Sequence, residues 1–327
     1  MKTIYLLTYE DVVLSSLAAP LDILTRTNEI LLSQDQAPAF AITRITPQAG
    51  PLTVDGISYW RGDCTIEDRP AQSFGHPQAL ILIPAFQGSW DQLKHAYADV
   101  LLWLQQHYQA GTEVASLCKG SYFLAEAGVL KGKPCTSHWA VTDDMRQRFP
   151  EIQLKPDAVV TDESGTYTGG GAFSSLNLLL YLIEKFCGHE LGVQVAKNFS
   201  IQRDHASQAH FSIFTGMTHH RDPLIREAQA YMEAHYHQAL NLETVAQKVH
   251  MSKRNFIRRF KQAVDMPPLE YLQRIKIEAA KKALEAGHLS IQSLTLEVGY
   301  NDSKTFRQVF KRLTGLTPQA YRQKYAR

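Results

Sequence analysis

Cysteine is scarce in this sequence, and no two cysteines lie close together. The 327 residues include four, Cys64, Cys118, Cys135 and Cys187. Zinc sites and the disulfide frameworks of secreted proteins need cysteines at short, regular spacings. The histidines between residues 205 and 237 are likewise scattered without the spacing of metal ligands. We therefore expect no metal, no cofactor and no disulfide-stabilised fold.

Long apolar runs are also lacking. The longest, Leu176–Ile183, is interrupted by Asn177, and it is far shorter than the roughly 20 residues needed to cross a bilayer. The short apolar run Ile4–Leu7 is followed at once by Glu10 and Asp11, which does not fit a signal peptide. These features predict a cytoplasmic protein without a membrane partner.

A net charge of only +2 conceals an uneven distribution. Residues 222–327 contain 18 Lys and Arg against 10 Asp and Glu, whereas residues 1–221 contain 16 against 22. A basic segment beside an acidic body indicates that only the C-terminal part binds a polyanion such as nucleic acid. At this length the chain can form two or more domains with their own cores.

The basic segment contains one pattern twice. A stretch that starts at Leu242 returns at Ile291, with an offset of 49 residues that becomes 50 after an inner turn. Each copy predicts a short amphipathic helix, a tight turn and a second helix, which is a helix-turn-helix. Ser252 is placed to cap the second helix of the first copy, and either Asp302 or Ser303 to cap that of the second.

Each predicted second helix has an aromatic face and a basic, polar face. The aromatic faces consist of Phe256 and Phe260 in the first copy and Phe306 and Phe310 in the second. Such a helix suits insertion into a DNA major groove. A single copy would fit a solvated surface helix equally well, but two copies favour DNA binding. A long helix from Pro268 to about Gly287 would hold the two units so that both reach successive major grooves.

Framework residues recur in both copies. They are Ala246, Met251, Ser252, Phe256, Arg259, Phe260, Lys261, Pro268, Tyr271 and Leu272 in the first, and Gly299, Tyr300, Phe306, Phe310, Lys311, Gly315, Thr317, Pro318, Tyr321 and Arg322 in the second. With them, residues from about 222 to 322 resemble the AraC/XylS-type DNA-binding domain. The resemblance implies double-stranded DNA as the partner, and leaves contact with RNA polymerase open. Matched by position, the base-reading side chains are Arg254, Ile257, Arg258, Lys304, Arg307 and Gln308.

The first two hundred residues have a different pattern, in which apolar strands alternate with helices. Expected strands are Thr3–Thr8, Phe40–Ile45, Ala79–Ile83 and Thr112–Leu117, with a hairpin of residues 158–161 and 166–169. Expected helices include Leu14–Leu32, Asp91–Tyr108 and Trp139–Phe149. This alternation predicts a doubly wound α/β domain with a mostly parallel sheet. Ligands of such domains bind at the carboxyl ends of the strands.

One of these strands runs into Cys118, and a helix is expected to begin immediately after it. At such a sharp turn the helix dipole and Lys119 would favour the thiolate. His138, after another short strand, could then pair with Cys118 as a base. The alternative is that Cys118 is a small buried residue and His138 a pocket wall. The sequence shows no third group to orient such a pair.

A second resemblance covers residues 1 to about 211. Its carrying stretches are Ala79–Pro84, Val114–Gly132, Thr136–Trp139 and the tail Arg203, Ser207, Gln208 and Phe211. They are similar to the ThiJ/PfpI, or class I glutamine-amidotransferase-like, domain. Followed by an AraC-type domain, this is the arrangement of GlxA-like transcriptional regulators. It implies a flavodoxin-like sensing and dimerisation domain in residues 1–211, a linker in 212–221 and an all-α DNA-binding domain with two helix-turn-helix units in 222–327.

The chain departs from the enzymes of this superfamily at three places. Ser16 stands where they have an acid near the cysteine, the segment Ala85–Gly88 replaces a glycine pair, and Asn177 replaces a second acid. The resemblance therefore implies a site that binds without catalysing, in which Cys118 and His138 are vestigial. The expected ligand-binding residues are Phe86, Gln87, Cys118, Lys119 and His138.

The leading hypothesis is a sequence-specific, homodimeric transcription regulator that responds to an unidentified small metabolite, and not an enzyme. Its rival is a cysteine-dependent amidase or glyoxalase-like enzyme with an accessory nucleic-acid-binding domain. A third hypothesis is a redox sensor that uses oxidation of Cys118.

Overall fold

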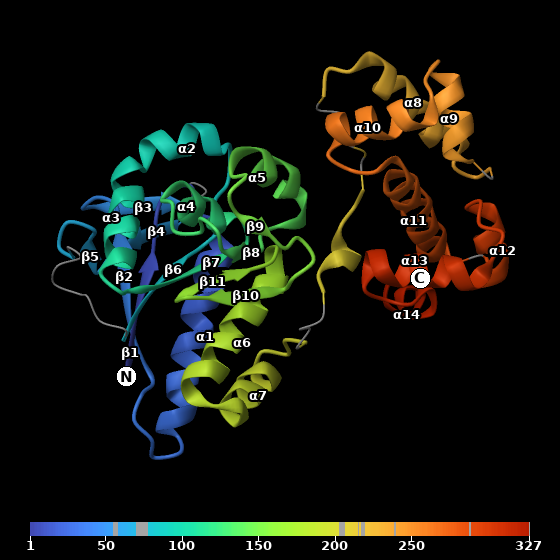
Figure 1. The fold of residues 1–327 in the computed structure, drawn as a ribbon. Helices are drawn as coiled ribbons and strands as arrows, with labels where there is room; N and C mark the ends of the chain where they lie inside the picture. The colour runs from blue at the N-terminus through green and yellow to red at the C-terminus, as the bar shows by residue number, and fades with distance from the viewer. Residues whose placement is uncertain are drawn as a thin grey trace. The chain divides into compact units, whose positions relative to one another are not determined.

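A computed structural model describes residues 1–54, 58–69, 78–202, 207–214, 216, 220–238, 240–287 and 289–326. The chain divides into two compact units, Met1–Gln208 and Ala209–Arg327 (Figure 1). Arg203 and His205, together with residues 215 and 217–219 of the predicted linker, lie outside the described residues. Among the described helices, none combines the length and apolar character that a bilayer span requires.

The N-terminal unit is built on a twisted, mostly parallel sheet. In spatial order its strands are β10 (Val160–Glu163), β11 (Thr166–Gly169), β7 (Glu113–Leu117), β6 (Ala79–Ile83), β1 (Lys2–Leu7), β2 (Phe40–Thr46) and β5 (Cys64–Thr65). Only the β10–β11 pair is antiparallel among these strands. The predicted strands and the predicted hairpin are therefore confirmed. Every residue of β6 is buried, as expected for a central strand covered on both faces.

Helices cover both faces of this sheet (Figure 1). One group packs together as α1 (Leu14–Leu32), α6 (Leu176–Cys187) and α7 (His189–Asn198), and another as α2 (Trp90–Ala96), α3 (Ala98–Gln109) and α4 (Ser121–Glu126). Smaller elements are α5 (Thr142–Arg148), the hairpin β3 (Pro51–Val54) and β4 (Ser58–Arg61), and the paired β8 (Pro134–Cys135) and β9 (Gln153–Leu154). The doubly wound α/β fold is confirmed.

Two predicted helices are interrupted. The helix expected over Asp91–Tyr108 breaks at Tyr97, whose ring packs on Tyr9 at 5.3 Å and whose hydroxyl donates to Asp11 at 2.8 Å. These tertiary contacts favour the non-helical backbone of Tyr97 (φ −111°, ψ 28°) over local helix propensity. The helix expected from Trp139 instead begins as the 3₁₀ turn η3 (Trp139–Val141) before α5.

The C-terminal unit is all helical in its described part. Its helices are α8 (Pro223–His235), α9 (Leu242–Lys248), α10 (Lys253–Val264), α11 (Pro268–Ala286), α12 (Ile291–Glu297), α13 (Ser303–Thr314) and α14 (Pro318–Tyr325). The pairs α9–α10 and α12–α13 are the two predicted helix-turn-helix units. Ser252 caps α10, and Asp302, the first of the two predicted candidates, caps α13. The long connecting helix α11 ends at Gly287, whose φ of +80° suits glycine.

Two separate apolar cores fill the C-terminal unit. One contains Phe256 and Phe260, and the other contains Phe306 and Phe310. All four rings are 0% exposed, which confirms their predicted place in the core. Because both second helices bury their aromatic faces, their basic faces point away from the cores.

Candidate functional site

The outer face of α10 carries the first group of predicted base-reading side chains. Arg254 and Arg258 are exposed on the side opposite the buried phenylalanines. A guanidinium N–H of Arg258 donates to Oδ1 of Asn255 at 3.1 Å, which orients Arg258 along the helix. Ile257 is half-buried and packs against the core of its unit, so only part of its side chain is open to a base.

The outer face of α13 carries the second group. Lys304, Arg307 and Gln308 are all exposed. The start of this helix is stabilised by Asp302, which accepts hydrogen bonds from the backbone N–H groups of Lys304 and Thr305 at 3.2 and 2.7 Å. The outer face of α13 therefore presents three polar side chains. The outer face of α10 presents two arginines and a partly covered isoleucine.

Arg259 lies in the same basic stretch but has a structural role. Its guanidinium donates to both carboxylate oxygens of Asp222, at 2.6 and 3.0 Å. Asp222 also caps α8 by accepting from the backbone N–H of Ile225. The Arg259 guanidinium holds the pKa of the Asp222 carboxyl below its usual value. This ion pair joins α10 to the start of α8, which sequence spacing could not reveal because the partners are 37 residues apart.

In the N-terminal unit, β7 ends at a strained turn. Cys118 has a φ of +53°, an uncommon value for a residue with a side chain, and begins the 3₁₀ turn η2 (Cys118–Gly120) that precedes α4. Its carbonyl accepts from the hydroxyls of Ser121 and Ser137, at 3.2 and 3.0 Å. Gly120 permits the turn because a Cβ there would lie 2.6 Å from the carbonyl oxygens of Ile83 and Pro84.

The expectation of a thiolate at Cys118 is wrong. Burial raises the pKa of the thiol, and this effect outweighs the opposing backbone N–H groups of Ala172 and Lys119 and the Lys119 charge. The sulfur is buried, with the residue only 7% exposed, and the helix that follows η2 is too short to supply a strong dipole. Burial therefore favours the protonated thiol at Cys118.

His138 lies on the same edge of the sheet but forms no hydrogen bond with Cys118 within the described structure. Its Nδ1 accepts from the backbone N–H of Ala140 at 3.1 Å, so the proton of the neutral ring is on Nε2. Burial and the charge of Lys119 lower its pKa. The ring packs against Gly171, where a Cβ would lie 2.5 Å from the His138 Cδ2.

The loop after β6 holds the remaining predicted ligand-binding residues. Phe86 is 2% exposed, packs on Trp90 and Tyr122, and has the Lys119 ammonium 4.6 Å from its ring centre. Gln87 is exposed, and its backbone N–H donates to the Asp11 carbonyl at 2.7 Å. Phe86 and Gln87 thus lie in the loop after β6, Cys118 and Lys119 in the turn η2, and His138 in the segment after β8. The Phe86 ring lies largely within an aromatic cluster.

Two of the departures from the related enzymes have structural roles. Ser16 accepts the backbone N–H of Ala85 on its Oγ at 2.7 Å, which ties α1 to the loop after β6. Asn177 donates to the carbonyl of Ser174 at 3.3 Å. Neither supplies the carboxylate that would orient a cysteine nucleophile.

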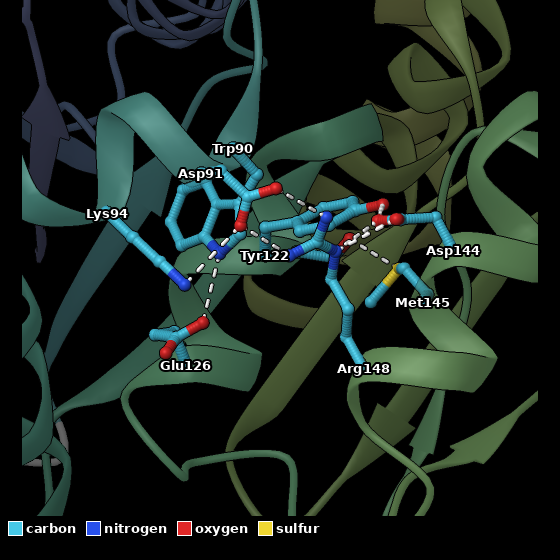
Figure 2. Close-up of polar contacts among 9 residues, drawn as sticks. Trp90, Asp91, Lys94, Tyr122, Glu126, Asp144, Met145 and Arg148 are labelled. Carbon is cyan, nitrogen blue, oxygen red and sulfur yellow. Dashed lines mark hydrogen bonds and ion pairs between the residues drawn. The ribbon is translucent and has the colours of Figure 1, made fainter.

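Arg148 clamps the helices that follow the two loops of the site. Figure 2 shows its guanidinium between Asp91 of α2 and Asp144 of α5. The four N–O distances of these hydrogen bonds are 2.7 to 2.8 Å. Tyr122 of α4 donates to Asp144 at 2.6 Å. These bonds tie α2, which follows the loop of Phe86, to α5, which follows the segment of His138. The sequence carried no signal for it, because Arg148 and Asp91 are 57 residues apart.

Gln208, the last residue of the N-terminal unit, forms part of the site wall. It is 1% exposed, and its Oε1 accepts the backbone N–H of Gly171 at 2.9 Å. Its Nε2 donates to the carbonyls of Ser137 and Pro156 at 2.9 and 2.8 Å, and to the hydroxyl of Thr136 at 3.0 Å. In the sequence, Gln208 belongs to the tail motif of the second resemblance, and that motif by itself predicts no role for it.

Comparisons with known proteins agree with this two-part structure. The DJ-1/PfpI family matches residues 56–185, and a helix-turn-helix domain family matches residues 245–324. The chain is 24% identical over 273 residues to the HTH-type transcriptional regulator GbdR of Pseudomonas aeruginosa, covering 83% of this chain and 74% of that one. It is 23% identical over 224 residues to the HTH-type transcriptional regulator GlxA of Rhizobium meliloti, covering 68% of each.

A solved structure supports the fold of the N-terminal unit. A ThiJ/PfpI family protein from Pseudomonas syringae superposes with a TM-score of 0.51 at 19% identity, covering 64% of this chain and 78% of that one. The chain thus carries a DJ-1/PfpI domain followed by an AraC-type helix-turn-helix domain, as its sequence predicted. It is a DNA-binding transcription regulator of the helix-turn-helix type.

Proposed function

We propose that a small effector binds the N-terminal unit beside Cys118 and thereby changes the affinity of the C-terminal unit for operator DNA. The effector site would comprise Phe86, Gln87, Cys118, Lys119 and His138. An effector that favours one of two arrangements of the site walls shifts the population of that arrangement.

The hydrogen bonds of the Gln208 side chain are the observation that carries this proposal. Its side chain bonds to Gly171, which supports the His138 ring, and to the carbonyl of Ser137. The next residue, Ala209, begins the 3₁₀ turn η5 (Ala209–Phe211) of the C-terminal unit. A shift of the site walls would therefore act directly on the residue where the two units meet in the chain.

The first residues of the C-terminal unit are anchored to α14 and to the long helix α11. The Nε2 of His210 lies 3.0 Å from the Lys324 ammonium, and its ring packs near Tyr325. Lys281 of α11 donates to the carbonyl of Ser212. The division into a domain of residues 1–211, a linker of 212–221 and a domain of 222–327 stays our proposal, with residues 209–212 as an anchored part of the connection.

On the DNA side, we propose that Arg254, Ile257 and Arg258 read one major-groove segment and that Lys304, Arg307 and Gln308 read the next. Arginine binds guanine edges in a bidentate manner, and glutamine does the same with adenine. Ile257 offers only apolar contact, for which a thymine methyl is suitable. By resemblance to the family, we also propose that the protein acts in the cytoplasm as a homodimer and has RNA polymerase as a further partner.

The same site supports binding and not catalysis. A nucleophilic cysteine needs a lowered pKa or an adjacent base, whereas burial raises the pKa of Cys118 and His138 bonds to Ala140. The raised pKa also disfavours the redox-sensor hypothesis, since oxidation follows thiolate character. The enzyme hypothesis predicts turnover of amides or α-oxoaldehydes that Cys118→Ser abolishes.

The test uses the full chain. Duplexes that bind tightly are selected from a random library, and metabolites are screened for a rise in the melting temperature, which reports binding to the native state. We expect at least one stabilising metabolite to change the dissociation constant for the selected duplex. Failure to enrich any duplex would overturn the DNA-binding assignment, and stabilisation without any change in DNA affinity would overturn the coupling.

A further inference from the structure

The two helix-turn-helix units have separate apolar cores that share one helix. In α11, Leu272 packs in the first core and Ile277 in the second. A single shared helix sets the distance between the units, but long helices bend and so define their mutual tilt poorly. A second point of attachment away from the cores would make the arrangement rigid.

Lys276 supplies such a point, between the two cores. Its residue is only 6% exposed. Its ammonium donates to the carbonyl of Gly299 at 2.6 Å and to that of Gln238 at 3.4 Å. Gly299 belongs to the turn between α12 and α13, whereas Gln238 belongs to the segment that leads from α8 into the first helix-turn-helix. The Lys276 ammonium therefore bonds both to the second helix-turn-helix and to the segment that leads into the first.

Gly299 allows the two units to approach this closely. A Cβ there would lie 2.6 to 2.9 Å from the carbonyl oxygens of Tyr236, His237 and Gln238, and its φ of +75° also favours glycine. Backbone carbonyls of both units thus converge just beyond the C-termini of α8 and α12, where helix dipoles add negative potential. The Tyr300 ring, 5.1 Å from the ammonium, completes the surroundings.

The ammonium compensates for this crowding of carbonyl oxygens. Lysine is seldom buried unless its charge is paired, and burial lowers the pKa of Lys276. A site that holds a buried cation between two units specifies one arrangement, because removal of the cation leaves carbonyl dipoles facing each other without a donor.

We propose that Lys276 is a positioning residue that fixes the second helix-turn-helix against the first, and so sets the operator spacing that α10 and α13 read together. This rests on the proposed DNA-binding function. Successive major grooves on one side of a duplex are about 10 base pairs apart. A rigid pair of reading helices tolerates little deviation from its own spacing, whereas a loose pair tolerates more at a cost in affinity.

The first experiment needs no DNA. Spin labels at Lys261→Cys and Lys311→Cys of the full chain, with Cys64 and Cys187 replaced by serine, report the distance between α10 and α13. We expect a narrow distribution in this background and a broader or shifted one after Lys276→Met, with Lys276→Arg closer to the parent. Lys282→Met, an exposed lysine of the same helix, is the matched control and should leave the distribution unchanged.

The second experiment measures binding to the selected duplex and to derivatives with one to three base pairs inserted between its two half-elements. Lys276→Met should weaken binding to the parent duplex about tenfold, the factor that corresponds to 1.4 kcal/mol, and should reduce the further loss on insertion. Lys282→Met should keep both values. Circular dichroism melting verifies folding, and Gly299→Ala provides an independent disruption of the same joint.

The outcomes separate the two proposals. A folded Lys276→Met or Gly299→Ala protein with an unchanged distance distribution and an unchanged insertion penalty would overturn the role of Lys276. If Lys276→Met does not fold, the Gly299→Ala measurements decide. Absence of binding to any duplex by the parent chain would instead overturn the proposed function, while the distance measurement still decides the role of Lys276.

Discussion

The backbone N–H of Gly171 donates a hydrogen bond to the Oε1 of Gln208 at 2.9 Å. This bond joins the wall beneath the His138 ring to the last residue of the N-terminal unit. If an effector controls DNA binding through this part of the site, substitutions at Gly171 or Gln208 should interrupt that control.

Gln208→Glu should uncouple effector binding from DNA affinity. Glutamate keeps the shape but loses the Nε2 donor and faces carbonyl oxygens with a negative charge. We expect the effector still to raise the melting temperature while its influence on DNA affinity shrinks several-fold. Gln92→Glu, at an exposed position of α2, is the control. A full effector response in the Gln208→Glu protein would contradict coupling through this residue.

Gly171→Ala should weaken effector binding without weakening DNA binding. The backbone at Gly171 has a φ of −77°, so alanine is acceptable there conformationally, but its Cβ would displace the His138 ring. The effector-induced rise in melting temperature should fall, and the unliganded affinity for DNA should stay. Cys118→Ser is the companion variant, and it should retain the effector response because no nucleophile is needed. Equal effector stabilisation in the Gly171→Ala and parent proteins would place the effector elsewhere.

Replacing a side chain that reads bases should affect DNA binding differently from replacing a cation that contacts DNA phosphates. Arg254→Ala or Lys304→Ala should cost about 1–3 kcal/mol and relax specificity at one operator position. Lys261→Ala or Lys311→Ala should weaken binding to all duplexes. It should also reduce the slope of log affinity against log salt concentration by about one. Anisotropy titrations over single-base operator variants and several salt concentrations distinguish the two. Unchanged binding in the first pair would mean that these faces do not read DNA.

The Arg259–Asp222 pair should make stability depend on pH in a defined direction. The fold lowers the pKa of Asp222, so the pair contributes to the free energy of unfolding above the unfolded pKa of about 4 and loses this contribution as pH falls through the folded value. Arg259→Met should lower the melting temperature at pH 7, and the gap to the parent should narrow towards pH 3. Arg258→Met, exposed on the same helix, should show little gap at either pH. A gap that is constant with pH would rule out this ion pair as its source.

Local patterns were sufficient for much of the fold. The buried strand Ala79–Ile83 and the helix Leu14–Leu32 were predicted with the bounds that the structure has, because apolar runs and periodicity are local properties. The duplicated pattern predicted both helix-turn-helix units and the burial of their four phenylalanines. Where prediction failed, as at the break in the helix at Tyr97, distant partners overrode the local preference.

The protonation of Cys118 shows why site chemistry was harder to predict. Sequence neighbours such as Lys119 argued for a thiolate, but the degree of burial, which raises the pKa, depends on the whole packed domain. The roles of Gln208, Arg148 and Lys276 could not be predicted either, because each side chain bonds to groups tens of residues away.

The sequence by itself determined the class of this protein, because strand–helix alternation and a repeated amphipathic helix pair are written in consecutive residues. Only the tertiary structure decided which basic residues are exposed on α10 and α13 and which hold the domain together, and which polar groups support the proposed effector site. Charge and burial there follow from contacts between segments far apart in the chain, and no spacing rule encodes such contacts.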